Sequence, residues 1–185
     1  MLSDKDLKKA IKDKRISFLP EVSANQIGPA SIDLKLSPYF KFFRTNKFSL
    51  IDIKQPLPQD FMDSVTLKNK EPLILHPGNF VLASTQEYLK LSNDIAMKVE
   101  GKSSLARIGL LVHTAGFVDP GFEGTLTLEI SNQSNVAVTL YPDMYICQVA
   151  VYQLSSPAET PYNKRKKSLY LKQRRPTEIK TKNLF

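Results

Sequence analysis

The chain has 185 residues, 42% of them hydrophobic and 24% charged, which is sufficient for one domain with a substantial core. No apolar run approaches the roughly 20 residues that span a bilayer, and the first residues lack the apolar stretch of a signal peptide. With a single cysteine, these features predict a cytoplasmic protein that has no internal disulfide and no membrane partner.

The net charge of +8 is concentrated at the carboxyl-terminal end. Residues 161–185 hold nine of the 26 Lys and Arg and one of the 18 acidic residues, so residues 1–160 carry 17 of each and are neutral. A neutral body is a poor nucleic-acid platform, whereas a basic tail is suited to meet polyphosphate. We therefore expect a body of residues 1–160 and, in the same domain, a mobile flap of residues 161–185.

The first element in the chain is a short amphipathic helix. Ser3 is its expected N-cap, Asp6 lies in the first turn, and Leu7 and Ile11 share one face. Pro20 ends this region. The sequence therefore predicts a single short helix before the sheet begins.

Short apolar or alternating runs follow from Ile32 onward and predict strands. They are separated by turn residues such as those of 119–121, which suits a sandwich, jelly roll or barrel. The clearest runs are residues 80–83, 110–112, 126–130 and 136–140. Residues 75–81 resemble residues 140–146, each reading as a strand, a Pro-led turn and a second strand. Cys147 lies in an apolar run and is expected to be a small buried side chain rather than a catalytic thiol.

The segment 101–109 (GKSSLARIG) carries the first chemical signal. Gly101 permits close approach, two serines supply donors, and Arg107 supplies a bidentate cation, a set that suits phosphate oxygens. The glycine spacing of a P-loop is missing. From chemistry alone, a polar turn that leads into a helix is the alternative interpretation, and it stays open.

Taken together, the ordered blocks resemble the dCTP deaminase family of the dUTPase-like superfamily. The matching segments are residues 31–36, 101–109, 114–124 and 156–162, together with Tyr170, Gln173, Pro176 and Thr177. This resemblance implies an all-β fold, a distorted jelly roll or β-clip of the dUTPase type with a short N-terminal helix. It also implies a homotrimer with active sites between subunits, a basic flap over the site, and feedback inhibition by dTTP.

Glu129 marks the deaminase branch within this resemblance. A carboxylate in an apolar strand suits proton transfer, because burial raises its pKa towards the working pH; the alternative is an exposed strand glutamate. A zinc deaminase needs a His-x-Glu and a Pro-Cys-x-x-Cys motif, which one cysteine and two separate histidines cannot supply. The resemblance therefore assigns water activation to Glu129, with Ser103 and the Ala115 carbonyl orienting the water and Arg107 balancing charge.

The remaining site residues also follow from the resemblance. Asp119 is expected against the deoxyribose 3′-hydroxyl, where it is suited to activate water for pyrophosphate release; its alternative is the first residue of an Asp-Pro-Gly turn. Mg²⁺ is expected to enter with the triphosphate rather than on dedicated protein ligands, and Asp33 is expected to be structural. Leu169 stands where the family usually has a lysine, for which Lys167 or Lys166 is the substitute. The expected nucleotide-binding residues are Lys102, Ser104, Asp119, Thr127, Tyr162, Lys167 and Gln173.

Three classes of activity stay open at this point, the first of them a dCTP deaminase with either of two products. Residues 115–117 resemble the bifunctional branch, which converts dCTP through dUTP to dUMP and pyrophosphate, whereas a deaminase-only enzyme stops at dUTP. The stretch between Arg107 and Asp119 is one residue shorter than in the deaminases, as in simple dUTPases, so hydrolysis of dUTP alone is the second reading. A non-catalytic binding module with a basic tail is the third.

Overall fold

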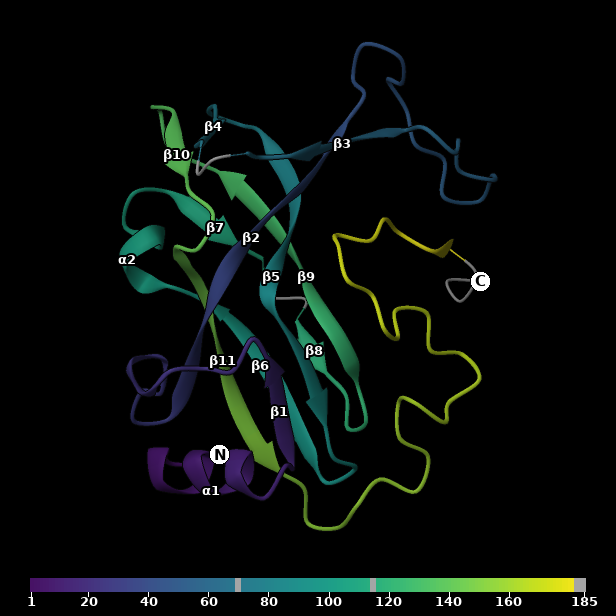
Figure 1. Ribbon diagram of the computed structural model, residues 1–185. Helices are drawn as coiled ribbons and strands as arrows, with labels where there is room; N and C mark the ends of the chain where they lie inside the picture. Colours follow the sequence, from purple (N-terminus) through teal and green to yellow (C-terminus); the bar gives the residue numbers. More distant parts are fainter. Residues whose placement is uncertain (69–70, 114–115, 182–185) are drawn as a thin grey trace.

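The structure is a computed structural model that describes residues 1–68, 71–113 and 116–181. Within these ranges the chain is mostly β, with two short α-helices and one 3₁₀ turn (Figure 1). The elements in chain order are α1 (Asp4–Lys12), β1 (Ile16–Leu19), η1 (Ala24–Gln26), β2 (Ser31–Phe43), β3 (Met62–Thr66), β4 (Leu73–Leu75), β5 (Phe80–Leu91), β6 (Ile95–Gly101), α2 (Ser103–Ala106), β7 (Leu110–Val112), β8 (Phe117–Val118), β9 (Glu123–Asn132), β10 (Val138–Leu140) and β11 (Tyr145–Gln153).

One curled antiparallel sheet forms the body of the molecule. Its strand order is β7-β9-β5-β2-β11-β6-β8, with β1 added beside β5 and β3 beside β2. The curl brings the two ends of this order together, since a Cβ on Gly101 in β6 would lie 3.6 Å from the Val112 side chain in β7. The predicted all-β, distorted jelly roll is confirmed.

The predicted strands fall where the apolar runs placed them. Residues 80–83 open β5, residues 110–112 are β7, and residues 126–130 lie inside β9. The last run begins later than expected, because the ladder of β10 starts at Val138. The two similar segments are strand–turn–strand units as predicted, and their first strands, β4 and β10, pair with each other in a separate two-stranded sheet.

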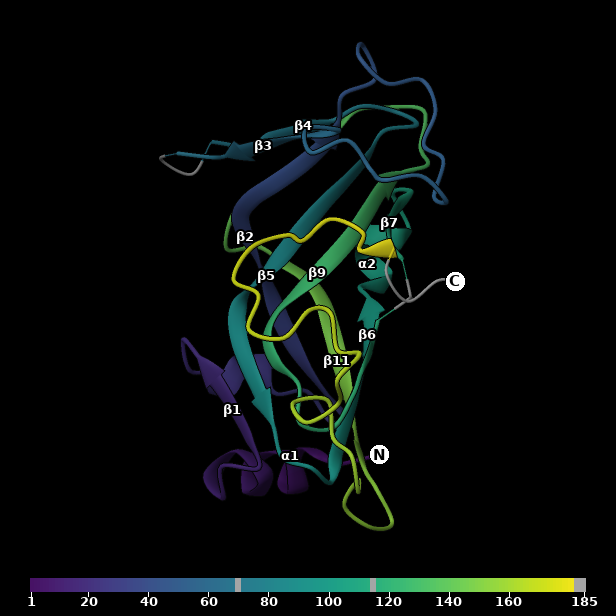
Figure 2. The same cartoon turned by 90° about the vertical axis from the view of Figure 1, so that its right-hand side faces the viewer.

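The N-terminal helix is confirmed and closes one end of the curled sheet (Figures 1 and 2). The Ser3 hydroxyl accepts a hydrogen bond from the Asp6 N–H, as expected of an N-cap. Leu7 and Ala10 are buried against the core, while Ile11 is half-buried. Across the described ranges, neither helix has the length and apolar character that crossing a membrane requires.

The core fills the inside of the curl with side chains that alternate along the strands. In β11, for example, Cys147, Val149 and Val151 point inward and are fully buried. Burial raises the pKa of the Cys147 thiol, and the nearby carboxylates of Glu87 and Asp33 raise it further. The thiol is therefore held protonated, which confirms its expected role as a small core side chain.

Candidate functional site

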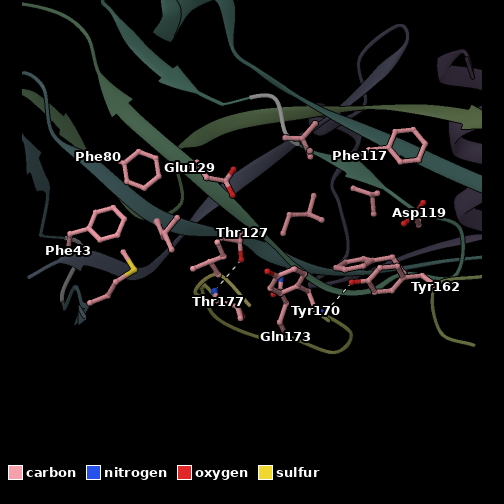
Figure 3. A pocket seen from close by; sticks show the side chains of 18 of the residues that line it. Phe43, Phe80, Phe117, Asp119, Thr127, Glu129, Tyr162, Tyr170, Gln173 and Thr177 are labelled. Carbon is pink, nitrogen blue, oxygen red and sulfur yellow. Dashed lines mark hydrogen bonds between the residues drawn. The ribbon is translucent and has the colours of Figure 1, made fainter. Parts of the chain in front are cut away.

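A cavity of about 600 Å³ lies between β9 and the carboxyl-terminal tail. One end is apolar, the middle carries Glu129 and Thr127, and the other end carries Asp119 and Tyr162 (Figure 3). Its walls also include the segment after β2 and five tail residues. The lining residues are Phe43, Ile51, Ile53, Phe61, Met62, Phe80, Leu82, Val99, Gly116, Phe117, Val118, Asp119, Phe122, Leu126, Thr127, Glu129, Tyr162, Tyr170, Gln173, Thr177 and Ile179.

Strand β9 aims its polar residues at this cavity. Thr127 and Glu129 lie two residues apart and so share one face of the strand, whereas Leu128 and Ile130 face the core. The Glu129 side chain is half-buried, and burial raises the pKa of its carboxyl above the ordinary value. The prediction that Glu129 is more than an exposed strand glutamate is supported by this placement, because desolvation prepares a carboxyl to exchange protons.

His113 is the ionisable neighbour of Glu129, and sequence reasoning assigned it no role. Its backbone N–H donates to the Glu129 backbone carbonyl at 2.8 Å, and its ring Nε2 lies 2.9 Å from the Ser131 hydroxyl. The ring also packs near Phe80, with centroids 6.0 Å apart. The charge of His113 lowers the Glu129 pKa, against the effect of burial. Pairing of β7 with β9 brings the two together, a relationship that motif spacing does not contain.

Asp119 begins the predicted turn and also lines the cavity, so its place in the turn and a role in the site are compatible. The Phe122 N–H donates to the Asp119 carbonyl at 3.1 Å across the turn. Gly121 has a φ of +77°, as expected of a turn glycine.

Gly116 allows close approach of two backbone segments. A Cβ there would lie 2.5 Å from the Val99 Cβ, so a side chain at this position would clash. Phe117 lies in the cavity wall.

The tail follows β9 along the cavity and is attached to it by hydrogen bonds of both backbone and side chains. The Gln173 backbone carbonyl accepts from the Thr125 N–H at 2.9 Å, and the Gln173 side-chain Nε2 donates to the Thr125 carbonyl at 2.8 Å. Further along, the Thr177 N–H donates to the Thr127 hydroxyl at 3.2 Å (Figure 3). The tail therefore binds the body more closely than its basic composition suggests.

Tyrosines give the tail its second attachment. The Tyr162 ring packs against Phe122 with centroids 5.5 Å apart, and its hydroxyl accepts from the Tyr170 N–H at 3.0 Å. Of the predicted nucleotide-binding residues, the structure brings Asp119, Thr127, Tyr162 and Gln173 to one cavity with Glu129. The Gln173 Oε1 is buried and has no hydrogen-bond partner within the described part of the chain, so it has capacity for a ligand.

The glycine–serine block lies elsewhere on the same chain. Ser103 and Ser104 begin helix α2, and Arg107 caps its end; all three side chains are exposed and none lines the cavity. Figure 1 shows α2 on the far side of β9 from the tail. The block does lead into a helix, as one of the two interpretations expected, and within one chain it is separated from Glu129.

Two further predicted residues, Lys102 and Lys167, do not line the cavity. The Lys102 ammonium pairs with the Asp33 carboxylate at 2.7 Å beside the Tyr145 ring, which agrees with a structural role for Asp33. Lys167 is exposed on the tail outside the cavity lining. Ala115, whose carbonyl was expected to orient water, lies outside the described residues.

Comparison with known proteins gives a consistent result. A family described as dCTP deaminase-like matches residues 1–154. The chain is 46% identical over 182 residues to "dCTP deaminase, dUMP-forming" of Dictyoglomus turgidum, covering 97% of this chain and 94% of the relative. It is 49% identical over 181 residues to the protein of the same description in Thermobifida fusca, covering 96% and 90%. Among solved structures, 2′-deoxycytidine 5′-triphosphate deaminase from Agrobacterium tumefaciens has a similar fold, with a TM-score of 0.62, 20% identity, and coverage of 81% of this chain and 46% of that one.

Proposed function

Since this chain belongs to the dCTP deaminase-like family, we propose that it is a dCTP deaminase of the dUMP-forming kind. The relatives that share nearly its full length are described by that activity. The observation in the chain itself that carries the proposal is Glu129, a half-buried carboxyl with a raised pKa facing the same cavity as Asp119. The resemblance of residues 115–117 to the bifunctional branch points the same way.

In the first reaction, Glu129 takes a proton from water as the water oxygen attacks C4 of cytosine. One of the two water protons ends on N3, and the other leaves with the amino group as ammonia when the C4–N bond breaks. The raised pKa of Glu129 favours this exchange, because a group that both accepts and donates protons works best near the ambient pH. The product of this step is dUTP, held in place for the second reaction.

In the second reaction, Asp119 activates a water that releases pyrophosphate and leaves dUMP. Asp119 and Glu129 line the same cavity, so one bound nucleotide is able to meet both. Mg²⁺ bound to the substrate triphosphate would supply positive charge that offsets the negative charge of the leaving pyrophosphate, and we assign it no protein ligand. Within the described residues no group of three His, Cys, Asp or Glu side chains is suited to hold a metal.

A second copy of the chain supplies the glycine–serine block. Ser103, Ser104 and Arg107 are exposed on α2 and lie away from the cavity of their own chain, where hydroxyl and guanidinium donors remain available to a neighbour. We infer a homotrimer in which each site combines Glu129 of one subunit with α2 of the next. Arg107 then contributes bidentate hydrogen bonds to phosphate or to the water, and Ser103 and the Ala115 carbonyl orient that water.

The tail closes the site in this proposal. Residues 161–185 act as a flap of the 1–160 body, with Tyr162 and Gln173 over the nucleotide and Lys167 reaching the phosphates in place of the lysine that Leu169 replaces. Thr127 adds a backbone contact to the nucleotide, and Lys102 adds a charged one. We expect dTTP, a pyrimidine deoxynucleoside triphosphate without a C4 amino group, to compete for this site, and we place the enzyme in the cytoplasm.

Product analysis tests the proposal. Purified protein is incubated with Mg²⁺ and dCTP, or with dUTP, and ammonia, pyrophosphate and nucleotides are separated. We expect ammonia, dUMP and pyrophosphate from dCTP. Accumulating dUTP means a deaminase that stops after the first step, and inert dCTP beside hydrolysed dUTP contradicts the deaminase assignment. Inertness towards both nucleotides, with salt-sensitive nucleic-acid binding through residues 164–185, supports the binding-module alternative instead.

A further inference from the structure

The tail segment 173–179 is a wall between two cavities. Gln173, Thr177 and Ile179 line both the cavity of Glu129 and a second cavity of about 640 Å³ on the other side of the tail. Arg174 and Arg175 line only the second one. The segment therefore directs its two consecutive arginines away from the site and towards the outer surface of the sheet.

Both arginines stack on tyrosines of neighbouring strands. The Arg175 guanidinium carbon lies 4.4 Å from the centre of the Tyr39 ring in β2, and that of Arg174 lies 4.9 Å from the centre of the Tyr88 ring in β5. These distances are within the range of cation–π contacts, in which arginine also gains from its flat, weakly hydrated guanidinium. Two strands thus offer one aromatic face each to two successive tail residues.

An ion pair extends the same row of contacts. Lys41 of β2 pairs with Glu178 of the tail at 2.6 Å, and both side chains are largely shielded from water. Glu178 is the one acidic residue of the basic tail, and it meets a lysine of the body. From residue 174 to residue 178 the tail is therefore attached to β2 and β5 through side chains, while Gln173 and Thr177 are hydrogen-bonded to β9.

We propose that Arg175 and Arg174 are positioning residues that clamp the tail and hold Gln173 and Thr177 at the wall of the active site. The guanidinium groups act on Tyr39 and Tyr88 and do not bind the triphosphate. This inference rests on the proposed function for its effect on turnover, although the clamp itself is a property of the folded chain. In consequence, the positive charge at residues 174–175 serves attachment of the tail, whereas Lys167 is exposed and lines neither cavity.

The test separates clamping from phosphate binding by changing the aromatic partner, which lies on the other side of the contact. Arg175→Ala and Tyr39→Leu are compared, alone and combined, for KM and kcat with dCTP and Mg²⁺. Loss of one cation–π contact predicts a rise in KM of about threefold to fivefold for each single variant, with kcat nearly unchanged. The double variant should be no worse than either single one, because each removes the same contact. Tyr39→Phe keeps the ring and should restore the wild-type KM.

Hydrogen exchange gives a readout that does not depend on catalysis. In both single variants the peptide covering residues 170–180 should exchange faster, because the Lys172 and Thr177 N–H groups bond to Glu123 and Thr127 only while the tail is held. Lys164→Ala removes an exposed tail charge away from the clamp and serves as the control. A raised KM in Arg175→Ala beside wild-type KM and exchange in Tyr39→Leu would overturn the clamp. Absence of turnover in the wild type would overturn the proposed function, and exchange would still decide the clamp.

Discussion

The backbone N–H of His113 donates a hydrogen bond to the backbone carbonyl of Glu129. This bond holds the end of β7 beside β9, the strand that carries the proposed proton-transfer group. The positive charge of His113 lowers the pKa of the Glu129 carboxyl, while burial raises it above its usual range, and burial is the larger effect. The pKa of Glu129 is therefore set by two opposing effects, burial and the charge of His113, of which the second can be removed by substitution.

The pH profile of deamination should report this balance. Glu129 must be ionised to accept the proton of water, so kcat/KM should fall as the pH decreases through its raised pKa. In His113→Ala the opposing charge is lost, the Glu129 pKa rises further, and the acid limb should move to higher pH. His76→Ala, an exposed histidine away from the cavity, is the matched control and should leave the limb in place. An unmoved limb in His113→Ala would exclude this electrostatic link.

Asp119→Asn should separate the two reactions. The amide keeps the shape of the side chain but cannot accept a proton from water, so release of pyrophosphate should drop by about a hundredfold or more. Deamination depends on Glu129 and should fall far less. The ratio of pyrophosphate to ammonia measures the effect, and a ratio that stays at the wild-type value contradicts the assignment of Asp119.

Mixing two inactive variants tests the shared site. In a Glu129→Gln subunit α2 is intact, and in an Arg107→Ala subunit Glu129 is intact. If each site takes Glu129 from one subunit and α2 from the next, co-refolded mixtures should regain activity that neither variant has alone. Sites built within one chain would leave every mixture inactive. Light scattering confirms that both variants still assemble.

Gly116→Ala should destabilise the protein. The added methyl would meet the Val99 side chain at 2.5 Å, and overpacking of this kind costs about 1–3 kcal/mol of unfolding free energy. Gly28→Ala meets only ordinary contacts and is the control. Denaturant unfolding compares the two, and a double variant with Val99→Ala should recover part of the loss. Equal stability of Gly116→Ala and Gly28→Ala would mean that Val99 moves aside freely.

Much of the fold and half of the site could be predicted from sequence, for identifiable reasons. Alternation in 126–130 placed Thr127 and Glu129 on one face, and Asp-Pro-Gly at 119–121 placed the turn. The link between His113 and Glu129 could not be predicted, because it depends on strand pairing between distant residues. The arginine–tyrosine contacts of the tail were missed for the same reason: basic composition predicted a solvated flap, whereas the partners lie in β2 and β5.

Ammonia release by Glu129→Gln is the most direct measurement of the central claim. Glutamine preserves size and polarity but cannot shuttle a proton, so deamination of dCTP should fall by at least a hundredfold while dCTP affinity, measured by calorimetry, stays within about threefold of the wild type. Loss of ammonia release with binding retained would place proton transfer on Glu129. Near-normal ammonia release from the variant would contradict the account.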